Sequence, residues 1–279
     1  MDTRLGLRFG PKASGKAAMC TLHLFFQIFS EAPVLFAATR DELLDRPWDP
    51  PALLAEAPRI YGPRDASAGG TWLGVNEDGV LVSLANHEGT LAGVVGPSLC
   101  SRGMLVLDAL RRRSAAEAAA FSEGAAPACK SYTLVIADRR DAFIVDRTPR
   151  GSRRYALAPG CHVVTNARFR DPDDAKAARC QRRMEALASR GRVPSDRDLA
   201  ELLSDHDTDS PAVRPLCIHP DGPPGFGTSS ASVVEIDDDG LVTRFLFAAG
   251  PPCTASLRDV TPVLRRRGRA RQSNAAQEP

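Results

Sequence analysis

The stretch "GGTWLGVNEDGVLVSLANH", residues 69–87, carries the clearest indication of the fold. Apolar residues lead up to Val75, the polar "NEDG" follows, and apolar residues resume from Val80 to Leu84. Asparagine, aspartate and glycine are typical of turns between strands, because they tolerate backbone conformations that other residues avoid. The stretch therefore predicts a β-hairpin that is followed by two polar residues, Asn86 and His87.

Strand signals recur on both sides of this hairpin. Apolar, strand-like segments occupy 21–28, 34–39 and 161–166, and further hairpins are expected at 132–146 and 230–250. Helices are expected over 101–121, 174–189 and 195–204, with Ser101 and Ser195 as the N-caps of the first and the last. Asp198 stands in the capping-box position after Ser195. The charged, proline-rich segment 40–51, "RDELLDRPWDPP", is predicted to be a loop.

This order of strands and helices indicates an α+β protein. Two antiparallel sheets packed face to face, with helices outside, would bury all the apolar runs in a four-layer αββα sandwich. The pattern by itself is also compatible with other α+β folds. Residues 19–260 are expected to form one domain, because neither a repeat nor a shift in composition divides them. Residues 1–18 are then an N-terminal extension, for which we favour a translation start at Met19 over a cleaved segment, and 261–279 a basic, disordered tail.

Composition excludes several classes of function. The 279 residues are 43% apolar, and 36 basic residues against 34 acidic ones give no argument for a nucleic-acid partner. The apolar runs are far shorter than the roughly 20 residues that span a bilayer, so an integral membrane protein is not expected. Seven widely spaced cysteines without a CxxC motif argue against a disulfide scaffold or a zinc ribbon. Reduced thiols and a cytoplasmic location are expected instead.

The sequence does not predict a metal site. Cys217, His219 and Cys253 lack a fourth ligand in a recognisable pattern, so no metal site is expected there. The acidic stretch "DHDTD" at 205–209 is more typical of an exposed loop than of a cation site.

Polar residues at the ends of predicted strands are the remaining candidates for chemistry: Cys20, Arg40, Asp41, Asn86 and Asn166. Taken singly, each has an ordinary interpretation. A cysteine before a strand is usually a small apolar core residue, and an asparagine after a strand usually forms a turn. Taken together and in order, they resemble a known family.

The resemblance rests on several motifs in sequence order and spans about 20–250. These are "MC" at 19–20, "ATRDELLDRP" at 38–47, the hairpin at 69–87, "SRGMLVLDAL" at 101–110, "YTLVIAD" at 132–138, "HVVTNARF" at 162–169 and "GFGTSSASVVEIDDDGLVT" at 225–243. The chain resembles the NRDE family, the relatives of the transport and Golgi organisation 2 proteins. Two positions depart from the family pattern: Thr39 replaces the asparagine of Asn-Arg-Asp-Glu, and Ser229 stands where eukaryotic members tend to carry arginine.

That family in turn resembles the cysteine branch of the N-terminal-nucleophile hydrolases, which includes penicillin acylases and bile-salt hydrolases. The resemblance implies Cys20 as the nucleophile, with Arg40, Asp41, Asn86 and Asn166 around it. It also implies hydrolysis or acyl transfer at a linear amide, without a cofactor.

Each of these residue types suits such chemistry. A thiol is nucleophilic only as thiolate, and the α-amine of an N-terminal Cys20, with a pKa of about 7.7–8.0, can accept its proton. Asn86 can donate to the oxyanion, a contribution of about 2.7–4 kcal/mol where such donors have been removed. Arg40 can lower the thiol pKa or hold a substrate carboxylate. Asp41 can orient the α-ammonium or Arg40. Asn166 can bind the backbone near Cys20 or the substrate amide.

The alternative is a non-catalytic protein on the same fold. Family members have been linked to haem handling and to membrane traffic, and a fold alone does not imply an activity. Under this hypothesis a small ligand or haem is bound, with Cys20 or His87 as a candidate iron ligand.

Overall fold

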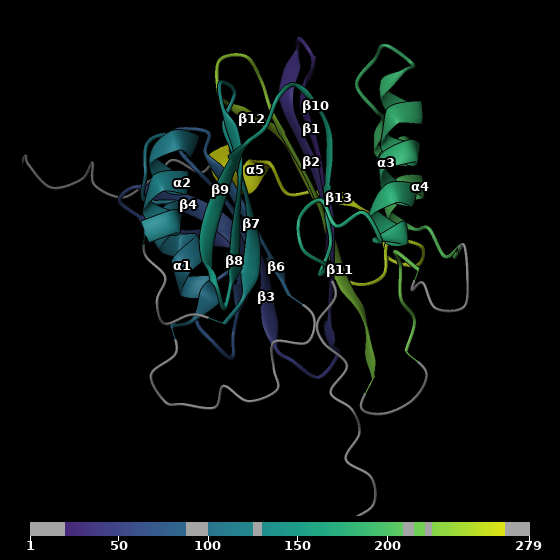
Figure 1. Cartoon of the computed structure of the whole chain (residues 1–279), viewed down its shortest axis with the longest axis horizontal. Helices are drawn as coiled ribbons and strands as arrows, with labels where there is room; N and C mark the ends of the chain where they lie inside the picture. Colours follow the sequence, from purple (N-terminus) through teal and green to yellow (C-terminus); the bar gives the residue numbers. More distant parts are fainter. Residues whose placement is uncertain (1–19, 88–99, 125–129, 209–214, 221–224, 266–279) are drawn as a thin grey trace, which may run out of the picture.

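The computed structural model describes residues 20–87, 100–124, 130–208, 215–220 and 225–265. In these residues the chain forms two antiparallel sheets (Figure 1). The first has the order β10-β1-β2-β11-β12-β13, with β10 at Gly160–Val164, β1 at Thr21–Phe29, β2 at Ala32–Leu43, β11 at Phe226–Ile236, β12 at Val242–Ala248 and β13 at Arg258–Asp259. The second has the order β3 to β9, with β3 at Trp48–Glu56, β4 at Arg59–Asp65, β5 at Leu73–Asn76, β6 at Leu81–Asn86, β7 at Tyr132–Ala137, β8 at Ala142–Thr148 and β9 at Gly151–Ala156.

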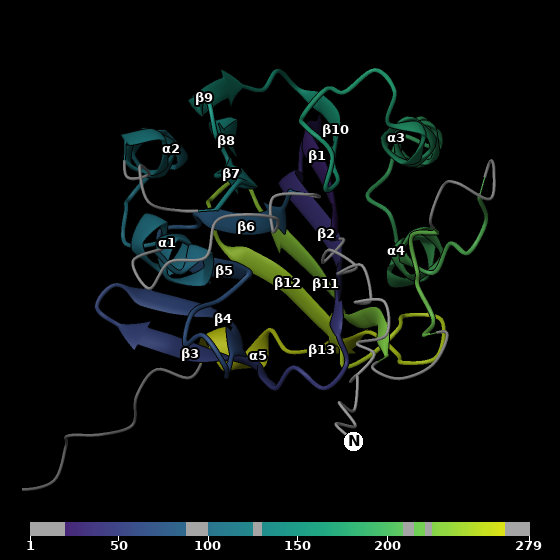
Figure 2. The ribbon, with the colours of Figure 1, turned by 60° about the horizontal axis from the view of Figure 1, so that its bottom comes forward.

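Helices cover the outer face of each sheet. They are α1 at Arg102–Ala109, α2 at Ala115–Gly124, α3 at Ala175–Ala188 and α4 at Asp196–Leu203. The short α5 at Pro262–Arg265 instead packs against the core between the sheets through Val263 and Leu264. Figure 2 shows α1 and α2 outside the second sheet and α3 and α4 outside the first, with the two sheets between them. The expected four-layer αββα sandwich is therefore confirmed.

Side chains of β1 point alternately to the two faces of the first sheet, which explains why one layer packs on each face. On β1, Leu22, Leu24 and Phe26 belong to the core between the two sheets. Phe25 and Phe29 on the opposite face pack with residues of α3 and α4. Side chains two residues apart share one face of a strand, so β1 supplies two cores at once. Burying each large apolar side chain stabilises the fold by about 1.5–3 kcal/mol.

The prediction of a loop over 40–51 was wrong. Strand β2 continues to Leu43, and β3 begins at Trp48 and includes Pro50 and Pro51. β3 is the edge strand of its sheet, and its pairing with β4 is interrupted between Asp49 and Ala52. Proline is tolerated at such a position because its missing N–H is not needed by a second neighbouring strand. The segment 43–68 is therefore mostly a hairpin.

The single helix expected over 101–121 is two helices. The side-chain Nδ2 of Asn76 donates to the carbonyl oxygens of Leu110 and Arg112 at 2.8 and 2.7 Å, which satisfies the end of α1. The Asp138 carboxylate accepts from the N–H of Ala115 at 2.7 Å, at the start of α2. Asn76 and Asp138 both belong to hairpins of the sheet below the helices. Contacts distant in sequence therefore determine where the chain is interrupted between α1 and α2.

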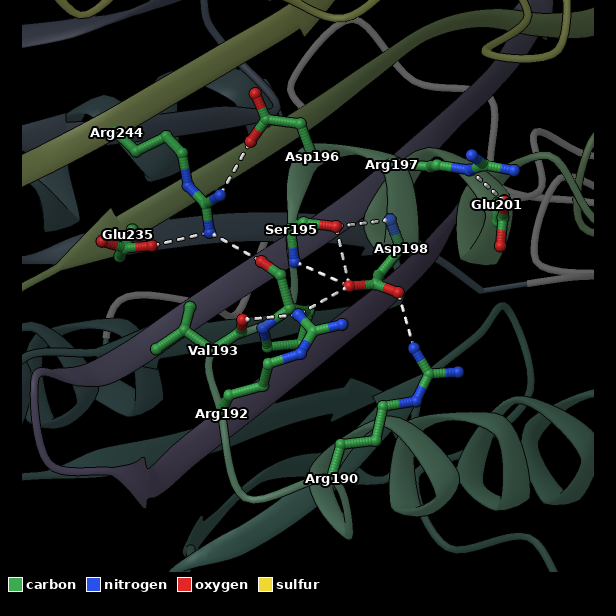
Figure 3. A network of polar contacts seen from close by, with 11 residues as sticks. Arg190, Arg192, Val193, Ser195, Asp196, Arg197, Asp198, Glu201, Glu235 and Arg244 are labelled. Atoms are coloured by element: carbon green, nitrogen blue, oxygen red, sulfur yellow. Dashed lines mark hydrogen bonds and ion pairs between the residues drawn. The ribbon is translucent and has the colours of Figure 1, made fainter.

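Helix α4 begins as expected, at a capping box. Ser195 accepts from the N–H of Asp198 and the Asp198 carboxylate accepts from the N–H of Ser195, as Figure 3 shows. Arg244 on β12 pairs with Asp196 at 2.7 Å and with Glu235 on β11 at 2.6 Å, and so ties the start of α4 to the sheet.

Two further expectations concern membranes and thiols. Among the described residues, none of the helices is long and apolar enough to cross a membrane. Cys100 is disulfide-bonded, which differs from the expectation of reduced thiols throughout. Among the described cysteines, the free thiols are Cys20, Cys161, Cys180, Cys217 and Cys253. The proposed extension 1–18 and most of the tail lie outside the described residues.

Candidate active site

Strand pairing brings Cys20, Arg40 and Asn166 to one end of the first sheet. Cys20 directly precedes β1 and only 6% of its surface is exposed. β1 pairs Leu22 with Val164 of β10, and Thr21 with Thr39 of β2. In an antiparallel pair, one residue back along one strand faces one residue further along its partner. Cys20 therefore lies opposite Asn166 on the β10 side and opposite Arg40 on the β2 side.

Arg40 is a buried cation with several partners. Its Nη1 donates to Ser229 Oγ at 2.9 Å, and Ser229 Oγ donates back to the Arg40 carbonyl oxygen at 3.0 Å. Its guanidinium lies 4.3 Å from the ring centroid of Trp72, and its Nη2 lies 3.5 Å from the Glu42 carboxylate. Burial lowers the pKa of Arg40, whereas Cys20 and Glu42 act in the opposite direction. These contacts hold a positive charge beside the Cys20 thiol.

Asp41 is fully buried and touches the thiol through its backbone. Its Oδ1 accepts a 2.6 Å hydrogen bond from Thr228 Oγ1, and its main chain hydrogen-bonds Cys20. Burial, followed by the charge of Asp41, raises the pKa of the Cys20 thiol to about 12, although this backbone bond and Arg40 oppose the change. With Cys20 inside a peptide chain, the thiol therefore stays protonated at neutral pH.

The two asparagines meet where the two sheets face each other. Asn166, which follows β10, donates from Nδ2 to the carbonyl oxygen of Asn86 at the end of β6. Asn86 Oδ1 is buried and has no hydrogen-bond partner among the described residues. The structure thus gathers four of the predicted residues, Cys20, Arg40, Asp41 and Asn166, on neighbouring strands of one sheet. The fifth, Asn86, joins them from the other sheet.

Sequence reasoning missed four side chains of this site. They are Trp72, Arg102, Thr228 and Ser229. Arg102, at the start of α1, is partly buried and interacts electrostatically with Cys20, while its Nη1 donates to the Ser131 carbonyl oxygen at 3.3 Å. Trp72 lies in "GGTWLG" and Ser229 in "GTSS", so both motifs were noticed without a role for these residues. Ser229, a departure from the family pattern, is the residue that fixes Arg40.

His87 and Thr39, which lie next to predicted site residues in the sequence, are also buried. His87 is buried, and its Nε2 lies 2.7 Å from Thr133 Oγ1 and 2.8 Å from the Asp146 carboxylate. Thr39 is buried in β2, and its Oγ1 has no hydrogen-bond partner within the part of the chain that the structure describes.

Comparison with known structures defines the class of fold. The chain is similar to penicillin V acylase from Agrobacterium tumefaciens, with a TM-score of 0.56, 15% identity and coverage of 87% of this chain and 86% of that one. It is also similar to a mutant of the conjugated bile acid hydrolase from Clostridium perfringens, with a TM-score of 0.54, 10% identity and coverage of 87% and 93%. An N-acylethanolamine-hydrolyzing acid amidase orthologue from Caenorhabditis elegans gives a TM-score of 0.51 at 14% identity, with coverage of 80% and 94%. The fold is that of the N-terminal-nucleophile hydrolases.

Sequence comparison then defines the family. Residues 19–245 match the family described as "Transport and Golgi organisation 2", so the chain belongs to that family. A curated relative is the Transport and Golgi organization protein 2 homolog of Bos taurus. It is 26% identical over 253 residues, which cover 75% of this chain and 84% of the relative.

Proposed function

We propose that this protein is a cysteine amidohydrolase or acyltransferase that acts on a linear amide, with Cys20 as an N-terminal nucleophile. The observation that carries the proposal is the surroundings of the Cys20 thiol. It is buried at the start of a strand, hydrogen-bonded by the Asp41 backbone and within the field of Arg40. The fold shared with penicillin V acylase and the acid amidase supports the same conclusion.

The reaction follows from these groups in four steps. The free α-amine of Cys20 takes the thiol proton, and the sulfur adds to the amide carbonyl carbon. The oxygen becomes an oxyanion, for which the Asn86 side-chain amide is the proposed donor. The tetrahedral species then collapses: the C–N bond breaks, and the leaving amine receives the proton from the α-ammonium. Water, or an acceptor amine in acyl transfer, attacks the resulting thioester and releases the thiol.

Charged side chains have supporting roles in this proposal. Arg40 favours the thiolate electrostatically, because a positive charge near a thiol lowers its pKa. Ser229 and Trp72 keep the guanidinium in place, as their contacts at 2.9 and 4.3 Å indicate. Asp41 and Asn166 are proposed to position the α-ammonium and the main chain next to Cys20.

The proposal requires that the α-amine of Cys20 is free. An amine inside a peptide bond is not a base, and the thiol pKa of about 12 then leaves almost no thiolate at neutral pH. The test therefore begins with intact mass and N-terminal sequencing of the protein isolated from its native cells. A mature end at Cys20 is expected, whereas a stable end at Met1 in an active preparation would contradict the mechanism.

Turnover of N-acyl amides by matched variants completes this test. Protein that begins at Cys20 should release the amine, and Cys20→Ala and Cys20→Ser should lose this activity. Cys180→Ser is the control, because Cys180 is a buried thiol of α3 outside the site. Equal turnover by Cys20→Ala and by unaltered protein would overturn the assignment of the nucleophile.

Haem binding stays a prediction. His87 Nε2 already lies 2.7 Å from Thr133 and 2.8 Å from Asp146, so nothing in the site favours it as an iron ligand. Haem titration tests this point, because a saturable Soret shift that disappears with Cys20→Ala would support binding at this site.

A cytoplasmic location is likewise proposed. The free thiols support it and the disulfide at Cys100 argues against it.

A further inference from the structure

Four side chains from three separate segments converge at a place that the proposed reaction does not use. His206 follows α4, Cys217 and His219 precede β11, and Cys253 lies between β12 and β13. One nitrogen or sulfur atom of each lies within 4.8 Å of the corresponding atom of every other member. Cys217 is buried and the other three are exposed. The sequence pattern of Cys217, His219 and Cys253 does not predict a metal site, because the fourth residue, His206, joins them only in the folded chain.

Three of the six separations between ligand atoms in this cluster are close to those of a tetrahedral zinc site, and all six are within 4.8 Å. His206 Nε2 lies 3.0 Å from His219 Nε2, His219 Nε2 lies 3.2 Å from Cys253 Sγ, and the sulfurs of Cys217 and Cys253 are 3.6 Å apart. With Zn–S near 2.3 Å and Zn–N near 2.05 Å, tetrahedral geometry requires about 3.3 Å between nitrogens, about 3.6 Å between nitrogen and sulfur and about 3.8 Å between sulfurs. Small outward shifts of the exposed side chains therefore make room for the ion.

We propose that His206, Cys217, His219 and Cys253 form a zinc site with two thiolate and two imidazole ligands. Two sulfurs and two nitrogens in a tetrahedral arrangement select zinc over harder ions such as Mg²⁺ or Ca²⁺. All four positions are filled by protein, which is the composition of a structural site, since catalytic zinc sites keep one position open. Loading is balanced by proton release: Zn²⁺ replaces the protons of the two thiols, and the imidazoles bind as neutral ligands.

The backbone around the cluster is held in place by its own hydrogen bonds. The N–H groups of Leu216 and Cys217 donate to the Asp205 carbonyl oxygen at 3.1 and 3.0 Å, which joins the segment before β11 to the residue that precedes His206. The Asp205 carboxylate is in turn paired with Arg179 of α3 at 2.6 Å and with Arg183 at 2.7 Å. The site therefore needs little main-chain rearrangement to accept the ion.

A chain of hydrogen bonds also links the cluster to the candidate active site. The N–H of Ile218, between two of the proposed ligands, donates to Thr228 Oγ1 at 2.8 Å. Thr228 Oγ1 donates to Asp41 Oδ1 at 2.6 Å. Zinc at the cluster would thus brace the segment that fixes Asp41, as well as tie the β12–β13 loop to the end of α4.

Metal binding by the full chain tests this proposal. Protein reduced and stripped with chelator is titrated with Zn²⁺ alone and with Co²⁺ alone. One equivalent of either ion should bind, and the cobalt form should show the visible bands of tetrahedral cobalt together with thiolate-to-cobalt charge transfer. Cys253→Ser and His206→Asn should each weaken zinc binding by more than about 100-fold, because even the loss of a residue that hydrogen-bonds a zinc ligand costs about 10–100-fold. Both residues are exposed, so these variants should fold.

Three matched controls separate this site from other thiols and from the proposed reaction. Cys161→Ser, Cys180→Ser and Cys20→Ser should bind zinc as the unaltered chain does, since none of these residues belongs to the cluster. Failure of the reduced chain to bind stoichiometric zinc would overturn the proposal. So would undiminished binding by the variant that combines Cys217→Ser with Cys253→Ser. A metal-free protein isolated with a Cys217–Cys253 bond, and so with two hydrogens fewer than the form that carries only the disulfide of Cys100, would show that the pair is a redox disulfide instead.

Discussion

Replacing Asp41 with asparagine should make the Cys20 thiol of the full chain more reactive. Burial, followed by the negative charge of Asp41, raises the pKa of this thiol from 9.0 to about 12. At pH 8, a thiol with this pKa is ionised in about one molecule in 10,000, against about one in ten at a pKa of 9.0. Asparagine keeps an oxygen that can accept from Thr228 and removes only the charge, so the pKa should fall.

The size of the effect follows from thiol chemistry. For every fall of one in the pKa, the thiolate population rises about tenfold and the intrinsic nucleophilicity falls about threefold, so alkylation accelerates about threefold. If Asp41→Asn lowers the pKa of the Cys20 thiol by one, iodoacetamide modification of Cys20 at pH 8 is therefore expected to accelerate about threefold.

Peptide mapping by mass spectrometry reads this rate separately for each cysteine. Cys161 provides an internal reference, because burial and Glu185 raise its pKa to about 11 and Asp41 is not among the causes. Unchanged or slower modification of Cys20 in a variant with an unaltered melting temperature, and with Cys161 unaffected, would refute the electrostatic reasoning.

Three further changes test other parts of the structure. His23 is fully buried, and burial is the main reason why its pKa is lowered from 6.5 to about 4. Between these pH values the unfolded chain binds more protons than the folded chain. The free energy of unfolding should therefore fall by about 3 kcal/mol as the pH drops from 6.5 to 4. Denaturant unfolding across that range should show a weaker pH dependence for His23→Gln, and an equal dependence would contradict the assignment. Ser229→Ala should cost about 1.5–3 kcal/mol in unfolding free energy, because Arg40 loses a buried partner. A thermal or denaturant midpoint that does not change would show that Ser229 is dispensable. Ser195→Ala should cost about 1 kcal/mol through the lost cap of α4, whereas the same measurement should show almost no change for Arg197→Ala, because this side chain is exposed to solvent.

Local patterns predicted the hairpin turn at 76–79 and the start of α4 well. The turn "NEDG" lies between β5 and β6 as expected, and the N-cap Ser195 begins α4 with the predicted capping box. These features depend on residues that are neighbours in sequence, so propensity and apolar periodicity are sufficient to reveal them.

The errors arose where distant contacts override local preference. Pro50 and Pro51 suggested a loop, yet an edge position in the sheet accommodates them in β3. The expected long helix is interrupted because Asn76 and Asp138, on hairpins beneath it, bind the backbone between α1 and α2.

The residues of the candidate sites also fall into those that the sequence indicated and those that only the folded chain brings together. Cys20, Arg40, Asp41, Asn86 and Asn166 were selected through the family resemblance, and the strand pairing brings them to one region. The partner of Arg40 is 189 residues away in sequence, at Ser229. His206 and Cys253, on either side of the Cys-x-His of the proposed zinc site, are likewise brought together only by the folded chain. Spacing alone carries no signal for such pairs.

The most direct measurement of the central claim is the mass of the protein during turnover. Chain that begins at Cys20 is mixed with an N-acyl amide, quenched in acid and analysed intact, beside the full chain and Cys20→Ser. The account predicts an acyl adduct, mapped to Cys20 and labile to hydroxylamine as a thioester, only in the protein with a free Cys20 amine. Amide turnover without an adduct at Cys20, or equal turnover by the full chain with its N-terminus intact, would contradict it.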